Sequence, residues 1–98
     1  MILVTGTVQA RPETLDAVLA ASLEHVHRSR EEPGCLLHSV HQDVEDPLRV
    51  GFLEHWRDAA ALAAHFAVPA SVAFVEAVAA LAAAPPSLEV YDAHRTSV

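Results

Sequence analysis

The sequence predicts one α+β domain, with helices on one face of an antiparallel sheet. The chain has 98 residues, about the size of one small domain, so residues 1–98 are expected to form a single unit. Stretches with the apolar spacing of amphipathic helices alternate with short segments that have the β-branched content of strands. Proline and glycine separate several of these segments.

The first two elements are predicted to be a strand and a long helix. Residues 2–9 are rich in β-branched residues and end shortly before Pro12, which suits the first turn of a helix. A helix is expected from Glu13 to about Glu31, because apolar or small residues there follow one helical face. These residues are Leu15, Val18, Leu19, Ser22 and Val26.

A hairpin is predicted after this helix. Pro33-Gly34 ends the helix, and residues 35–43 and 49–56 form the two strands. The turn between them contains Pro47, and its length suggests that Asp43 pairs with Arg49.

Two more helices and a last strand are predicted in the C-terminal part. Asp58 can cap a short helix over residues 59–67, because its carboxylate can accept a free backbone N–H. A further helix from about Ala70 to Ala82 and a strand over residues 88–94 follow. The resulting order, β-α-β-β-α-α-β, is the split βαβ arrangement of a ferredoxin-like fold with a four-stranded antiparallel sheet.

Both faces of this sheet are predicted to carry apolar residues. Helices can cover only one face, so the other is expected to pack against the same sheet of a second copy, which gives a two-fold homodimer. In the first strand, Ile2, Val4 and Val8 lie on one side and Leu3 on the other. In the hairpin, one side carries Leu36, Val40 and Phe52, and the other carries Leu37 and Leu53.

The register of the hairpin brings a histidine and a glutamate together. His38 falls opposite Glu54, and Leu36 falls opposite Trp56. The histidine is expected to lower the pKa of Glu54. The pair can act as a general acid and base beside an aromatic wall, or it can be a buried polar pair that satisfies itself without doing chemistry.

His65 is a second candidate, and it lies in the helix predicted over residues 59–67. Helical spacing brings it near Leu62, the residue of that helix best suited to face the sheet. His65 can line the same pocket as Trp56 and Phe74, or it can stabilise the end of its short helix, where the dipole favours a cation.

The seven histidines lack the spacing of a metal site. His38 and His41 point to opposite faces of a strand, and His25 and His27 diverge on a helix. We interpret His25, His27 and Arg28 as a solvated helix face, and no HExxH or paired-cysteine motif occurs, so no metal is predicted. The scattered glycines form no nucleotide or flavin motif, so no cofactor is predicted either.

The composition excludes several kinds of partner. Six Lys and Arg against thirteen Asp and Glu give a net charge of −7, which repels nucleic acid. Cys35 is the only cysteine, so no internal disulfide is expected. No stretch approaches the ~20 apolar residues of a membrane span, and the first residues lack a basic signal sequence. A cytoplasmic protein without a membrane partner is therefore expected.

Three motifs occur in order along the chain. They are Glu32-Pro33-Gly34-Cys35-Leu36 at the start of a strand, Phe52-Leu53-Glu54-His55-Trp56-Arg57-Asp58 at the end of the next, and Ala61-Leu62-Ala63-Ala64-His65-Phe66 in a helix. In this combination the chain resembles the antibiotic biosynthesis monooxygenase family over nearly its whole length. Many relatives have tyrosine at the position of His38 and histidine at that of Ala70, whereas His65 stands where the family often has histidine.

The resemblance implies a dimeric ferredoxin-like α/β barrel and oxygenation of a small aromatic, quinol or polyketide-like substrate by O₂, without flavin, metal or haem. A phenol or anthrone that loses a proton is electron-rich enough to reduce oxygen itself. His65 and His38 are the predicted proton acceptors or hydrogen-bond donors, and Glu54 orients His38. The alternative function is a non-catalytic small-molecule-binding or stress-associated dimeric module. The predicted apolar walls of the pocket are Trp56, Phe52, Phe66 and Phe74.

Overall fold

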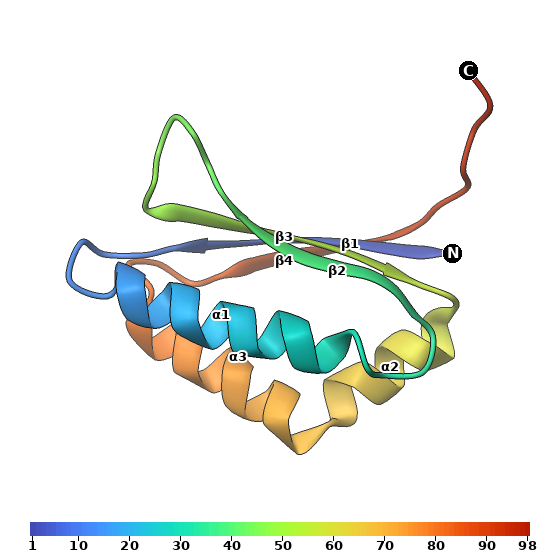
Figure 1. The fold of residues 1–98 in the computed structure, drawn as a ribbon, viewed down its shortest axis with the longest axis horizontal. Helices are drawn as coiled ribbons and strands as arrows, with labels where there is room; N and C mark the ends of the chain where they lie inside the picture. The colour runs from blue at the N-terminus through green and yellow to red at the C-terminus, as the bar shows by residue number, and fades with distance from the viewer.

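The computed structural model describes residues 1–98 and confirms the predicted α+β architecture. Four antiparallel strands form one sheet in the order β2-β3-β1-β4. All three helices lie on one side of this sheet, and its other side is bare (Figure 1). The elements are β1 (Ile2–Gln9), α1 (Leu15–Ser29), β2 (Cys35–Gln42), β3 (Arg49–Trp56), α2 (Ala59–Ala67), α3 (Pro69–Leu81) and β4 (Ser87–Asp92).

The bounds of β1, β3 and α2 are those predicted from the sequence, and the other elements differ by one or two residues at most of their ends. Helix α1 starts later than predicted because the chain first makes a turn, in which Thr14 Oγ1 accepts a hydrogen bond from the Arg11 N–H at 3.0 Å. The same hydroxyl donates to the Leu81 carbonyl at 2.8 Å and so ties the start of α1 to the end of α3. The predicted cap of α2 is confirmed, since Asp58 Oδ1 accepts from the Ala61 N–H at 2.8 Å.

The hairpin has the predicted register over most of its length. His38 pairs with Glu54, and the Asp43 N–H donates to the Arg49 carbonyl at 3.0 Å. The predicted pairing of Leu36 with Trp56 is wrong. A β-bulge between Cys35 and Leu37 inserts one extra residue, so that Cys35 lies opposite Trp56 and Leu36 is 59% exposed.

Gly34 determines how the chain enters β2. Its φ of +82° lies in the left-handed region, and a Cβ atom there would come within 2.6 Å of the Ala61 side chain. Its carbonyl accepts a hydrogen bond from the Arg57 N–H at 2.8 Å. The loop between α1 and β2 is therefore held against the start of α2, which brings Glu32 close to that helix.

Helices α2 and α3 form a pair bent by 72° at Val68. Val68 is extended and Pro69 occupies the first turn of α3, which stops α2 and starts α3 at once. No single helix is long and apolar enough to cross a membrane, and only this bent pair passes such a test, by length and composition alone. His65 and Ser71, on either side of the bend, are buried.

The core is built mainly of small aliphatic residues. One cluster joins the sheet to α1 and α3 through Val8, Val18, Val50 and Val78. A second cluster packs Trp56 against α2. Several polar residues are buried beside these clusters, and a group of them forms the candidate site.

Candidate active site

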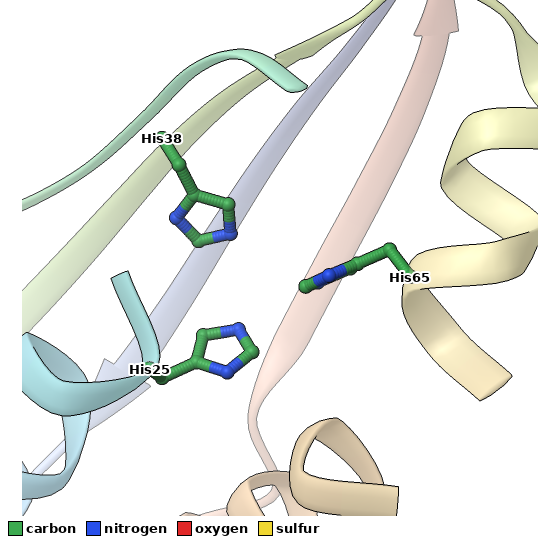
Figure 2. Close-up of side chains that lie close together, drawn as sticks. All are labelled: His25, His38 and His65. Carbon is green, nitrogen blue, oxygen red and sulfur yellow. The ribbon is translucent and has the colours of Figure 1, made fainter. Parts of the chain in front are cut away.

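Three histidines from three different elements meet between the sheet and the helices (Figure 2). His25 comes from α1, His38 from β2 and His65 from α2. All three are buried, and their ring centroids lie 5.2 to 5.5 Å apart. One ring nitrogen of each lies within 4.8 Å of a ring nitrogen of each of the others. Spacing along the sequence was no guide to this cluster, because the fold assembles it from distant segments.

The prediction that His25 and Arg28 are a solvated helix face is wrong. His25 stacks on Phe74 with ring centroids 3.9 Å apart and planes 5° from parallel. Arg28 Nη2 donates to His25 Nδ1 at 2.8 Å and lies 3.2 Å from the Ser71 hydroxyl. The sequence did contain a signal, since His25 follows Ser22 by three residues and so continues the buried stripe of α1.

His25 is held in its neutral form. Burial, followed by the neighbouring His38 and His65 and by Arg28, lowers its pKa from 6.5 to about 3. An arginine can only donate, so His25 Nδ1 is the acceptor and the single ring proton is on Nε2.

His65 is oriented by a residue to which sequence reasoning gave no role. Its Nδ1 lies 3.0 Å from Glu32 Oε1, in the loop held by Gly34. An ionised carboxylate can only accept, so Nδ1 carries the proton and donates it to Glu32. In the neutral ring this leaves the Nε2 lone pair free, as in the carboxylate–histidine pairs that activate nucleophiles.

Glu54 lies at the centre of the site. Its Oε1 accepts a hydrogen bond from Trp56 Nε1 at 2.8 Å, and the same oxygen lies 3.4 Å from His38 Nε2 and 3.9 Å from His65 Nε2. Burial raises the pKa of Glu54, but His38, the Trp56 hydrogen bond and His65 together outweigh burial and bring the pKa below its usual value. Glu54 is therefore a buried anion.

His38 is the least satisfied residue of the group. Its side chain is fully buried, and neither ring nitrogen has a hydrogen-bond partner. The 3.4 Å contact with Glu54 is within ion-pair distance but is not aligned as a hydrogen bond.

A cavity of about 250 Å³ opens beside this group, between the sheet and α3. Glu54 and His65 line it together with His25. Of the predicted walls, Phe52, Phe66 and Phe74 line the cavity. His38 and Trp56 do not. Trp56 is wholly buried, donates its indole N–H to Glu54, and packs against the His65 ring with centroids 4.6 Å apart.

Comparison with known proteins agrees with the motifs in the sequence. The profile of the antibiotic biosynthesis monooxygenase family matches residues 1–77. An uncharacterised protein of Synechocystis sp. is 34% identical over 95 residues, which are 97% of this chain and 65% of that relative's length.

Solved structures resemble the whole fold. A Deinococcus radiodurans protein described as a candidate antibiotic biosynthesis monooxygenase has a TM-score of 0.94 and 26% identity, over 100% of this chain and 97% of that one. Another structure named antibiotic biosynthesis monooxygenase has a TM-score of 0.89 and 32% identity, over 97% of this chain and 100% of that one. The chain belongs to the antibiotic biosynthesis monooxygenase family.

Proposed function

We propose that the protein is a monooxygenase that oxidises a small aromatic, quinol or polyketide-like substrate with O₂, and that His65 is its proton acceptor. Membership of the family supports a monooxygenase-like role. The observation that carries the proposal is the pairing of His65 Nδ1 with Glu32 at 3.0 Å beside a cavity with aromatic walls. This pairing leaves Nε2 as a base of fixed orientation.

The first step is removal of a proton from the bound substrate. His65 Nε2 takes the proton, and the imidazolium that forms lies between Glu32 at 3.0 Å and Glu54 at 3.9 Å. Two nearby carboxylates stabilise that cation, so they make the transfer more favourable. Glu54 lines the cavity beside His65, whereas His38 acts from behind the cavity wall because it does not reach the cavity itself.

The deprotonated substrate then reduces O₂ without help from another reductant. In an anthrone, the reacting CH₂ carbon loses two hydrogens and gains one oxygen atom as a carbonyl. The second oxygen atom leaves with both hydrogens as water. The substrate supplies all four electrons, so the protein has to bind, deprotonate and exclude water.

The cavity suits a flat aromatic molecule. Phe52 and Phe74 meet edge to face with centroids 5.9 Å apart, and Phe66 lies next to His65. Aromatic walls of this kind favour planar ligands through offset and edge contacts. Few polar groups reach the cavity. We therefore expect the acidic hydroxyl or CH group of the substrate to be oriented towards His65.

The proposal includes a homodimer that packs sheet against sheet. Leu3, Leu37, Leu53 and Tyr91 alternate with the inward residues of their strands and so face the bare side of the sheet. Tyr91 is 44% exposed and Leu37 is 37% exposed in the single chain. A second copy of the same sheet would cover them.

Oxygen uptake by untagged, EDTA-treated protein with a panel of anthrones and quinols tests the function. ¹⁸O₂ should label the product of an active substrate. His65→Gln should lower the rate by about 10²- to 10⁴-fold, the usual contribution of a general base. His27→Gln, at an exposed position of α1, should leave the rate unchanged. Full activity in His65→Gln would refute the assignment of the base, and binding without turnover of any substrate would identify a binding module instead.

A further inference from the structure

We propose that the cluster of His25, His38 and His65 binds one divalent transition-metal ion, with Zn²⁺ as the test case. Imidazole nitrogen is a common ligand for such ions. The three rings converge from α1, β2 and α2 (Figure 2), with one nitrogen each inside a span of 4.8 Å. This inference goes beyond the proposed function, because a metal ion on His65 Nε2 would occupy the lone pair that the base needs.

The first support is the unsatisfied state of His38. Both of its ring nitrogens are buried and lack a hydrogen-bond partner. Buried polar groups without a partner are rare, because leaving them unpaired costs free energy. A metal ion bound to one nitrogen would supply the missing interaction.

The second support is the hydrogen bond between His65 Nδ1 and Glu32. Histidines that bind metals usually donate their other ring N–H to a carboxylate or carbonyl, which fixes the tautomer. Glu32 accepts from His65 Nδ1 at 3.0 Å and leaves Nε2 as the free nitrogen. The residue therefore already has the arrangement of a metal ligand.

The third support is the charge around the cluster. The carboxylate of Glu54 lies 3.4 Å from His38 and 3.9 Å from His65, and Glu32 lies beside His65. Arg28 Nη2 contacts the His25 ring, and Arg30 Nε donates to the His38 carbonyl at 3.0 Å. The two carboxylates lie against the rings of His38 and His65 and so would attract a dication bound there, and Glu54 is close enough to become a fourth ligand.

Binding requires the rings to move closer together. Nitrogen ligands at about 2.1 Å from a tetrahedral Zn²⁺ lie about 3.4 Å apart, so an inward movement of about 1 Å or less per ring suffices. His25 is the ligand that must change most. Its Nδ1 accepts from Arg28, so the proton on Nε2 has to shift to Nδ1, and Arg28 has to give up this hydrogen bond while it keeps Ser71.

This competition predicts a specific order of variant effects. His38→Gln and His65→Gln should each weaken Zn²⁺ binding by at least about 100-fold, since each removes a ligand. Glu32→Gln should weaken Zn²⁺ binding by about 10- to 100-fold, because it weakens the hydrogen bond that orients His65. Arg28→Met should tighten binding, because it frees His25 Nδ1 and removes a positive charge.

The test is a titration of untagged, metal-stripped protein with Zn²⁺ by calorimetry and with Co²⁺ by visible absorption. The expected result is one ion per chain and the absorption of four-coordinate Co²⁺. His27→Gln and His41→Gln, at exposed positions, should bind as the wild type does. Circular dichroism of each variant checks that it folds, and if His38→Gln does not fold, the Glu32→Gln and Arg28→Met variants carry the test.

Absence of binding at one ion per chain would overturn the proposal, and so would affinity that depends on His27 or His41 instead of His65. These measurements use no substrate. A failure here therefore leaves the oxygenation proposal intact, while a failure of oxygen uptake leaves the metal site intact.

Discussion

The two faces of the sheet use the same strands for different purposes. In β3, Phe52, Glu54 and Trp56 point towards the helices, whereas Leu53 and His55 point to the bare side. The inner face carries the buried anion Glu54 and the buried His38, and the buried His25 and His65 approach it from α1 and α2. The outer face holds apolar side chains that no helix covers (Figure 1). Neighbouring residues of one strand therefore have different proposed roles, one in proton transfer on the inner face and one in dimer formation on the outer face.

This contrast predicts that substitutions on the two faces act separately. An inner substitution should change proton transfer or the response to pH. An outer substitution should change the association of two chains. A variant on one face that produced the effect expected of the other would show that the two faces do not act independently.

The largest effect on the outer face is expected for Leu53→Asp. A carboxylate in the proposed interface, between Thr5 and Ser39 of the neighbouring strands, loses its water without gaining a cationic partner, so the homodimer should weaken by about 10²- to 10³-fold. Sedimentation equilibrium measures the dissociation constant. Val44→Asp, at a position of the hairpin turn that is 97% exposed, is the matched control and should leave it unchanged. A wild-type chain that is monomeric at all concentrations would rule out the proposed dimer.

A smaller effect is expected for Glu32→Gln at the inner site. The amide oxygen can still accept from His65 Nδ1, but the negative charge that stabilises the imidazolium is lost. We expect kcat to fall by about 10-fold with little change in KM, and the pH dependence of kcat to change. Glu31→Gln, at the exposed neighbouring position, is the control. A rise in KM with kcat unchanged would instead mean that Glu32 serves substrate binding.

The local part of this structure could be predicted from the sequence. Alternation along two strands and the length of their turn placed His38 opposite Glu54, and the structure has this pairing. Asp58 was recognised as a cap because capping depends on residues only three apart. The bulge at Leu36 was missed, because it depends on how the Gly34 turn packs against α2.

The non-local part could not be predicted in the same way. Glu32 meets His65 across a separation of 33 residues, and no pattern in either segment indicates the partner. His25 could have been found, because it continues the buried stripe of α1, but its polar side chain suggested an exposed position. The cluster forms only when α1, β2 and α2 pack together, and pairwise spacing carries no information about that packing.

The smallest effect concerns the inner face at acidic pH. The pKa of His25 is about 3 in the folded chain and 6.5 in its unperturbed form. Between these two pH values the unfolded chain binds a proton that the folded chain does not, so acidification favours unfolding. Above pH 6.5 His25 is neutral in both states and does not change the free energy of unfolding with pH. One such proton changes the free energy of unfolding by at most about 1.4 kcal/mol per pH unit.

His25→Gln removes this proton, so the free energy of unfolding should fall less steeply between pH 6.5 and pH 5 than in the wild type. Urea titrations at pH 7.5, 6 and 5 measure the slope. Glu54, whose pKa is lowered, also destabilises the fold as the pH falls, but it does so equally in both proteins if its own environment is kept. His27→Gln removes a histidine from the exposed side of the same helix and should leave the slope as it is. Equal slopes in His25→Gln and the wild type would mean that His25 takes up its proton as readily in the folded chain as in the unfolded one. Burial would then give the inner face no electrostatic difference from the outer face.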